Sequence, residues 1–323
     1  MRHDGNTLAT MLLMSQMIAG KEELVLPLNA REYYALRERA KNAGLSMGDL
    51  LSMDMSAFQM RLGMEEGDAF RACVLLGRTL PLSMAMEKFY ANGIDVMTID
   101  GAAYPARLSE RLGQKAPPML YFAGNAEILW DDAIGIVGGK PLKGDCEERV
   151  RALVRDVSQA GCAIVSEGST DVARAVLDEA QRCGARVILC AATALSKCAS
   201  VSVAAGAIRE GRALALSMMH PDTVYTASHA RKRNKLIYGL SQAVFVFSAD
   251  DGRGATFEGA AESLRNGFCK HVYAWDTKLY PGNARLISMG AKRYGAGEAE
   301  FSDIRHHWAA SYARQMSLFG NAE

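Results

Sequence analysis

The sequence predicts an α/β protein in which a mostly parallel sheet carries helices on both faces and follows a small all-helical N-terminal domain. Short apolar segments of five or six residues recur along the second part of the chain, with helical patterns between most of them. Continuously apolar strands that alternate with helices are typical of parallel sheets covered on both sides. The first part of the chain instead repeats apolar residues at helical spacing and has no long alternating run.

The composition is that of a globular protein with two domains. The 323 residues are 49% hydrophobic and 23% charged, and the formal net charge is +1. Because the molecule has almost no net charge, any basic site for a nucleic acid must be local. The seven cysteines contain no C-x-x-C pair. We therefore expect free thiols in a cytoplasmic protein, with no metal and no cofactor. The apolar segment at residues 11–19 is too short to span a membrane, and no membrane association is expected.

Three regions are predicted along the chain: a helical domain of the SAM-like or helix-hairpin type at residues 1–95, an α/β domain at 96–293 and a C-terminal helix and tail at 294–323. Helices are predicted at residues 8–18, 29–44, 68–76 and 83–91, with Pro81 between the last two and with two short helices capped by Ser46 and Ser56. Asn29 and Glu32 form a capping pair. Such a domain serves either as a scaffold or dimerisation cap, or as a docking module for DNA or protein.

Strands are predicted at residues 93–99, 117–122, 133–137, 162–166, 186–190, 213–217, 243–248 and 271–275. In parallel sheets of this kind, ligands bind beyond the carboxyl ends of the strands. The residues that follow the strands are therefore the candidates for a functional site.

The strand at residues 133–137 runs into Gly138, Gly139 and Lys140, and an amphipathic helix is predicted at residues 147–160. A strand, a glycine turn and a helix make the first unit of a phosphate-binding domain, because glycine lets backbone amides approach an anion. The glycine spacing matches neither the dinucleotide fingerprint nor the P-loop. The turn is therefore either a phosphate site or a tight turn that binds nothing.

Two further loops follow predicted strands. Residues 166–171, Ser-Glu-Gly-Ser-Thr-Asp, precede a helix that Ser169 or Thr170 caps. Residues 250–256, Asp-Asp-Gly-Arg-Gly-Ala-Thr, precede another helix. Both loops offer backbone amides to an anion, and the alternative for each is an ordinary capped turn.

A basic segment opens the helix before the strand at residues 243–248. Arg231, Lys232, Arg233 and Lys235 lie within five positions, and no acidic residue occurs from residue 223 to residue 249. A solvated helix face usually mixes the two signs of charge. Clustered Arg and Lys residues favour several phosphates in a row, as in a polymer backbone, and a solvated face is the alternative.

These segments together resemble the DNA-processing protein A (Smf) family. The resemblance rests on Val-Gly-Gly-Lys at 137–140, on residues 166–171, on Arg-Asn-Lys-Leu-Ile-Tyr-Gly-Leu-Ser at 233–241, on Gly-Ala-Thr at 254–256 and on Pro-Gly-Asn-Ala-Arg-Leu-Ile at 281–287. The chain departs from the family pattern at Lys140 and Lys235, which replace arginines, and at Glu167, which replaces a glycine. A lysine keeps the charge but loses bidentate phosphate binding.

The resemblance implies a Rossmann-like domain that binds single-stranded DNA without cutting it, acts in recombination or DNA uptake and loads a RecA-type recombinase. It also implies a homodimer formed through the α/β domain. The DNA-binding or phosphate-binding residues that we predict are Gly138, Gly139, Lys140, Ser166, Gly168, Ser169, Asp171, Arg231, Lys232, Arg233, Asn234, Lys235, Gly252, Gly254 and Thr256.

The C-terminal tail carries one more motif. Gln-Met-Ser-Leu-Phe at 315–319 resembles the peptide that binds the bacterial sliding clamp, with Gln315, Leu318 and Phe319 as its anchors. The alternative is an amphipathic tail that packs back on the domain.

No catalytic residues are predicted, because no Ser–His–Asp set or metal-ligand spacing stands out. The alternative function is a nucleotide-binding or nucleoside-phosphate-hydrolysing protein of the same superfamily, whose loop is G-G-x-G-T-x-x-E. Here Glu258 follows Thr256 by two positions and not three, which turns the carboxylate by about 100° on a helix.

Overall fold

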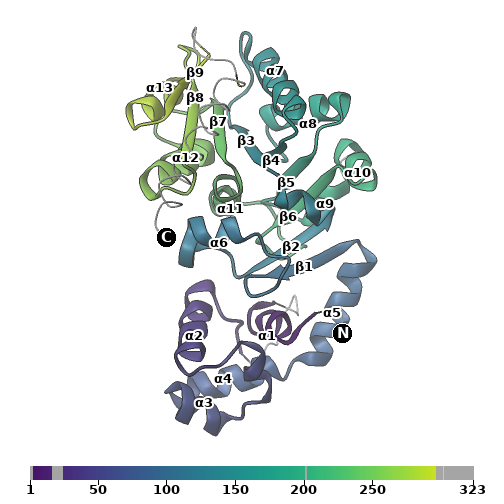
Figure 1. The fold of residues 1–323 in the computed structure, drawn as a ribbon, viewed down its shortest axis with the longest axis vertical. Helices are drawn as coiled ribbons and strands as arrows, with labels where there is room; N and C mark the ends of the chain where they lie inside the picture. Colours follow the sequence, from purple (N-terminus) through teal and green to yellow (C-terminus); the bar gives the residue numbers. More distant parts are fainter. Residues whose placement is uncertain (1–2, 17–24, 201, 296–300, 302–323) are drawn as a thin grey trace, which may run out of the picture. The chain divides into compact units, whose positions relative to one another are not determined.

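The computed structural model describes residues 3–16, 25–200, 202–295 and 301 (Figure 1). Its contacts divide the chain into two compact units. The first unit consists of Met1–Leu129 with Ala191–Arg233, and the second consists of Trp130–Cys190 with Asn234–Glu323. Both units are therefore discontinuous in the sequence.

Helices form the N-terminal part of the first unit, as predicted. They are α1 (Gly5–Met14), α2 (Ala30–Asn42), the 3-10 helix η1 (Gly48–Ser52), α3 (Met55–Leu62), α4 (Glu66–Leu76) and α5 (Thr79–Ala91). The capping pair of α2 is confirmed, because Asn29 Oδ1 accepts from the Glu32 amide and Glu32 Oε2 accepts from the Asn29 amide.

Two predicted helix starts are wrong. Asp54 caps α3 in place of Ser56, because its carboxylate accepts a hydrogen bond of 2.8 Å from the Ala57 amide. Pro81 lies inside the first turn of α5 and not before the helix. A first-turn amide has no acceptor within its own helix, so a proline there removes no hydrogen bond.

The first unit also contains three antiparallel strands in the order β1–β2–β6, namely β1 (Ile94–Thr98), β2 (Met119–Gly124) and β6 (Ala213–Ser217). Its remaining helical segments are α6 (Ala106–Leu112), η2 (Gly113–Lys115), η3 (Ala126–Trp130), α9 (Leu195–Ser200) and α10 (Ser202–Arg209). Polar contacts tie the N-terminal helices to the end of β1. Arg37 donates to both carboxylate oxygens of Asp100, and Tyr33 donates to the same group.

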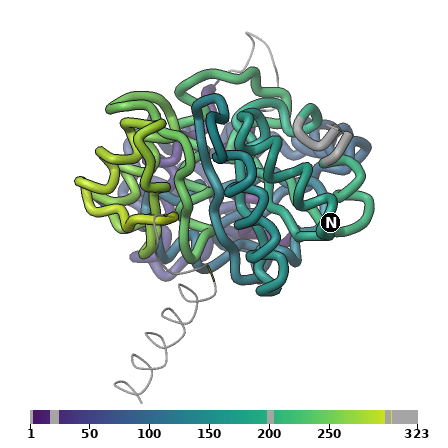
Figure 2. Tube along the Cα trace, turned by 90° about the horizontal axis from the view of Figure 1, so that it is seen from above, coloured from purple at the N-terminus to yellow at the C-terminus, as the bar shows by residue number. Residues whose placement is uncertain are grey.

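The second unit contains a parallel sheet, which confirms the predicted sheet type. Its strands are β5 (Val187–Cys190), β4 (Ala163–Glu167), β3 (Ala133–Gly138), β7 (Ala243–Ser248), β8 (His271–Trp275) and β9 (Lys292–Tyr294), in that spatial order. Figure 2 shows the teal segment with β3 to β5 beside the green-to-yellow segment with β7 to β9. Only β9 was not predicted, because Lys292–Tyr294 is short, polar and exposed at two of its three positions.

The helices of the second unit cover both faces of the sheet. They are α7 (Cys146–Gln159), α8 (Asp171–Cys183), the part of α11 (Ala227–Leu240) from Asn234 onward, α12 (Gly254–Asn266) and α13 (Pro281–Ser288). Successive residues of a strand face opposite sides of the sheet, so Gly135 and Gly138, three positions apart, face opposite sides. In β3, a Cβ on Gly135 would meet Ile237 of α11, and a Cβ on Gly138 would meet Val172 of α8. Helices α8 and α11 therefore lie on opposite faces.

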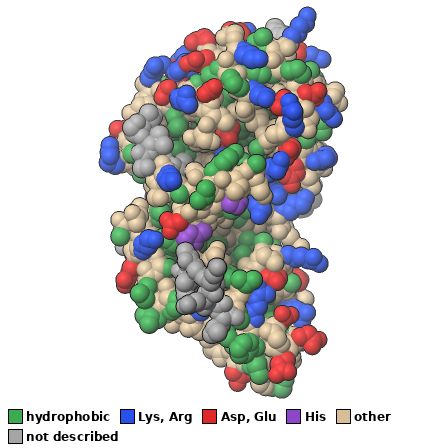
Figure 3. Space-filling model, turned by 180° about the vertical axis from the view of Figure 1, so that it is seen from behind, with side chains coloured by type: hydrophobic (Ala, Val, Ile, Leu, Met, Phe, Trp, Pro, Cys, Tyr) green, Lys and Arg blue, Asp and Glu red, His purple; other side chains and the backbone are tan. Residues whose placement is uncertain are grey.

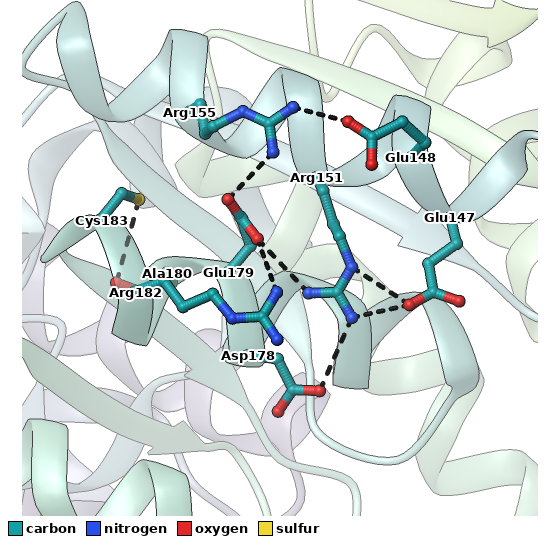
Figure 4. A network of polar contacts seen from close by, with 9 residues as sticks. All are labelled: Glu147, Glu148, Arg151, Arg155, Asp178, Glu179, Ala180, Arg182 and Cys183. Carbon is teal, nitrogen blue, oxygen red and sulfur yellow. Dashed lines mark hydrogen bonds and ion pairs between the residues drawn. The ribbon is translucent and has the colours of Figure 1, made fainter.

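An ion-pair network joins α7 to α8 (Figure 4). Glu179 of α8 is 7% exposed at its side chain and lies within 3.4 Å of Arg151, 3.0 Å of Arg155 and 3.2 Å of Arg182. Arg151 also pairs with Glu147, and Arg155 pairs with Glu148. The network thus surrounds one buried carboxylate with three guanidinium groups and fixes the two helices against each other.

Candidate nucleic-acid interface

The order of the strands changes direction at β3 in the second unit. From β3 the chain runs outward through β4 to β5, and it later returns to β7 on the other side of β3 and runs outward to β9. Such a switch point opens a crevice beyond the carboxyl ends of the two central strands. The loops that follow β3 and β7 therefore form the candidate site of this unit.

The turn after β3 is bonded to the end of β7. The Gly139 amide donates to the Ser248 carbonyl at 2.8 Å, and the Lys140 amide donates to Ser248 Oγ at 3.1 Å. Ser248 Oγ in turn donates to the Lys140 carbonyl at 3.0 Å. The amides of Gly139 and Lys140, which the sequence offered to a phosphate, are therefore used to hold the two loops together.

Close packing explains both glycines of this turn. A Cβ on Gly138 would lie 2.5 Å from Val172 Cγ2 and 2.6 Å from Ser248 Oγ. A Cβ on Gly139 would lie 2.6 Å from Thr256 Oγ1. Thr256 is buried against this turn and begins no helix, because α12 already starts at Gly254.

An acidic side chain lies among the cations of this site. Lys140 Nζ is 2.9 Å from Asp250 Oδ2, and Arg253 Nε is 2.8 Å from the same oxygen. The Asp251 amide donates to Asp250 Oδ1 at 3.1 Å. The hydrogen bond from Lys140, together with Arg253, holds the pKa of Asp250 below its usual value, although partial burial opposes this.

Helix α12 begins without a side-chain cap. Gly252 and Gly254 have φ of +70° and +84°, values that favour glycine, and Arg253 at the N-cap makes no capping hydrogen bond. The space beside Gly254 is open. On the other side of the loop, Arg285 of α13 lies 3.2 Å from Asp251.

Asn283, a residue missed at the sequence level, holds the loop after β7. It is fully buried, and its Oδ1 accepts from the Ala249 amide at 2.9 Å. Its Nδ2 donates to the carbonyls of Phe247 and Trp275 at 2.9 and 3.0 Å. The Pro-Gly-Asn segment at 281–283 could have indicated a structural role for Asn283. A buried asparagine needs hydrogen-bond partners for both its side-chain oxygen and its side-chain nitrogen.

The loop after β4 is mostly committed to its own structure. Ser166 is buried, and its Oγ donates to the Ile136 carbonyl at 2.8 Å. Thr170 caps α8 by accepting from the Ala173 amide at 3.2 Å, which confirms one of the two predicted caps. Asp171 lies 3.5 Å from Arg174. Gly168 and Ser169 are exposed between these residues.

The basic segment of α11 is divided between the two units, since Arg233 ends one segment of the first unit and Asn234 begins one of the second. The basic segment was predicted to open this helix, but α11 begins at Ala227, so Arg231 and Lys232 lie in its second turn. Both side chains are exposed. Arg233 is only 2% exposed, so it is not one of the surface cations that the sequence predicted. Just before the helix, Tyr225 is exposed at 54% of its surface.

The two residues that follow in the second unit have partners of their own. Asn234 is buried and donates to the Ala255 carbonyl of α12 at 2.6 Å. Lys235 Nζ lies 3.6 Å from Glu262. Leu236, Ile237 and Leu240 are buried, which confirms the apolar side predicted for this helix.

Both signs of charge occur on the face drawn in Figure 3, where Lys and Arg side chains are interspersed with Asp and Glu side chains, in keeping with the net charge of +1. No helix in the described ranges has both the length and the apolar character to cross a bilayer. The clamp-like motif with Gln315, Leu318 and Phe319 lies outside the described residues.

Residues 95–305 match the model of the family described as DNA recombination-mediator protein A. DNA processing protein A from Streptococcus pneumoniae is similar in structure, with a TM-score of 0.56 and 20% identity over 84% of this chain and 96% of that chain. DNA processing protein A from Helicobacter pylori, whose structure concerns its single-stranded DNA binding mode, has a TM-score of 0.51 and 18% identity over 62% of this chain and 90% of that chain. No curated protein gives a significant match.

Proposed function

Since the chain belongs to the DNA recombination-mediator protein A family, we propose that it binds single-stranded DNA and does not cut it. In the first unit, the contact surface is the second turn of α11, where Arg231 and Lys232 are exposed. In the second unit, it is the edge formed by Lys140, Arg253 and the exposed loop at residues 168–169. A phosphate polymer can be held by several weak surfaces at once, each of which adds a contact to the same strand.

The observation that carries this proposal is the pair of exposed cations in the second turn of α11. Arg231 and Lys232 are exposed there, and no acidic residue occurs in the sequence from residue 223 to residue 249. A helix face that is merely solvated usually mixes the two signs of charge. A segment with basic residues alone is expected where an anionic ligand selects it.

Tyr225 supports a strand of unpaired bases as the ligand. Its ring is exposed just before the two cations, on the same segment of the first unit. Aromatic rings stack on bases regardless of sequence, and bases are available for stacking only in single strands. Replacement of Tyr225 by Ser is therefore expected to weaken binding to a single strand more than binding to a duplex.

The decisive comparison is between two pairs of charge reversals. Arg231→Glu with Lys232→Glu is expected to weaken binding of a labelled oligothymidylate by at least tenfold at about 0.1 M salt, because two phosphate contacts become repulsive. Arg31→Glu with Lys41→Glu changes the same charge at exposed positions of α2 and is the matched control. Equal affinity for the two pairs would contradict the proposal.

The alternative, binding or hydrolysis of a free nucleotide, is less well supported by the contacts at the switch point. The amides of Gly139 and Lys140 and the hydroxyl of Ser166 already have partners within the fold. Lys140 itself pairs with a carboxylate. Calorimetry with a panel of nucleotides tests the alternative, which requires a tight complex with at least one of them.

We further propose that the protein loads a RecA-type recombinase on the bound strand, acts as a homodimer and contacts the sliding clamp through residues 315–319. Removal of those five residues is expected to abolish capture of the clamp and to leave strand binding unchanged. Capture that persists after the deletion would exclude the motif.

A further inference from the structure

The switch point of the second unit holds an anion site that the protein fills with its own side chain. Three donors converge on the carboxylate of Asp250. Lys140 Nζ and Arg253 Nε reach Oδ2 at 2.9 and 2.8 Å, and the Asp251 amide reaches Oδ1 at 3.1 Å. An ammonium, a guanidinium and a backbone amide are the groups that proteins use to bind a phosphate oxygen.

We propose that Asp250 acts as a selectivity residue, because its carboxylate occupies the position of a backbone phosphate until a single strand displaces it. This inference rests on the proposed function and adds to it a reason why the ligand is a polymer and not a single nucleotide. Neither Asp250 nor its role follows from the motifs of the sequence.

The competition between carboxylate and phosphate explains the selectivity. Asp250 is covalently held beside Lys140 and Arg253, so its effective concentration is far above that of a free phosphate. A mononucleotide gains only this one site and must displace the carboxylate to do so. A strand that is already held elsewhere presents its next phosphate at a comparable effective concentration and can compete.

The surroundings allow the exchange. Arg253 is largely exposed, Lys140 is partly exposed, and Asp250 is 27% exposed at its side chain, so a phosphate can reach both cations from solvent. The space beside Gly254, at the uncapped start of α12, is open as well. Asn283 and Gly282 fix the backbone of residues 249–250 from behind, so the carboxylate can leave without moving the loop.

The test uses Asp250→Asn, with Asp276→Asn as its matched control. Asp276 is 28% exposed and pairs with Arg293 at 2.5 Å after β8, so its replacement removes the same charge and frees a cation at another strand end. We expect Asp250→Asn to bind thymidine monophosphate and oligothymidylate about tenfold more tightly than the native chain. We expect Asp276→Asn to stay within about twofold of the native chain, since it releases Arg293 and leaves Lys140 and Arg253 paired with Asp250.

A double-mutant cycle with Lys140 identifies the mechanism. If Asp250 acts by covering Lys140, most of the increase in strand affinity caused by Asp250→Asn is lost when Lys140→Gln is also present. Asp250→Asn should also make the logarithm of strand affinity fall more steeply with the logarithm of salt, by about 0.7 for each cation released. Asp250→Ser provides the same comparison if the asparagine variant does not fold.

The outcomes separate this inference from the function on which it rests. A native chain that binds the strand, with Asp250→Asn no tighter than Asp276→Asn, overturns the inference and leaves the proposed function intact. An increase in strand affinity from Asp250→Asn that is equally large in the Lys140→Gln background also overturns the inference. If neither the native chain nor any variant binds a strand, the proposed function fails and the inference fails with it.

Discussion

At Glu179, an almost fully enclosed carboxylate stays charged because three arginines reach it. Burial by itself would raise its pKa, but hydrogen bonds from Arg155, Arg182 and Arg151 outweigh this, and the pKa of Glu179 lies below its usual value. The arginines come from α7 and α8, so the charge of this one residue contributes to the packing of two helices.

Glu179→Ala is expected to lower the free energy of unfolding by about 2 kcal/mol, because it leaves guanidinium groups at a partly buried position without their shared acceptor. Glu148→Ala removes an exposed partner of Arg155 and should cost less than about 0.5 kcal/mol. Urea denaturation of the two variants measures both values. Equal losses would show that Glu179 is not the centre of the network.

The pH dependence follows from the same carboxylate. A group whose pKa is lowered in the folded state adds stability above its unfolded pKa of about 4.3, and this stability is lost as the pH falls through the folded pKa. The difference in melting temperature between the native chain and Glu179→Gln should therefore be constant from about pH 6 to pH 8 and should shrink below about pH 4. A difference that grows on acidification would contradict this assignment.

Residue types were predictable at the switch point, but residue contacts were not. Lys140, Gly252 and Gly254 stand where the strand-end rule expects ligand-binding groups. The sequence gives no sign that Asp250 lies on Lys140 or that Arg233 is buried, because both facts depend on which side of a loop or helix meets its neighbours. Local pattern fixes the position of a side chain along an element and not its partner in the fold.

The elements themselves were predictable wherever pattern and burial agree. The strands β3, β4, β5, β6, β7 and β8 are mostly apolar and almost entirely buried, so each was found within a residue or two of its bounds. Strand β9 was missed because its residues are polar, and its place is set by pairing with β8. The starts of α3 and α5 were misplaced because Asp54 competes with Ser56 as a cap and because proline is tolerated in a first turn.

The loop after β7 depends on one side chain of another element. Asn283→Ala is expected to lower the free energy of unfolding by about 3 kcal/mol, since it leaves the Ala249 amide and two buried carbonyls without their partner. Asn266→Ala removes an exposed asparagine at the end of α12 and should cost less than about 0.5 kcal/mol. Thermal denaturation distinguishes the two, and a small loss at Asn283 would mean that other groups hold this loop.

On the scale of the whole molecule, charge is balanced and its use is local. A chain of net charge +1 cannot attract DNA by its overall field, so the proposed affinity must come from a few local cations. Arg231 and Lys232 are exposed on α11, and Lys140 and Arg253 pair with Asp250, a carboxylate that we propose a phosphate displaces. Each cation that meets a phosphate releases a counterion, so the number of contacts can be measured in solution.

The most direct test of single-stranded DNA binding is the affinity for an oligothymidylate measured between about 0.05 and 0.3 M salt. The logarithm of the affinity should fall linearly with the logarithm of the salt concentration, with a slope of about −0.7 for each phosphate contact, or about −3 for four cations. The pair Arg231→Glu with Lys232→Glu should reduce the steepness by about 1.4. An affinity that does not change with salt, or a slope that the pair leaves unaltered, would contradict strand binding by these cations.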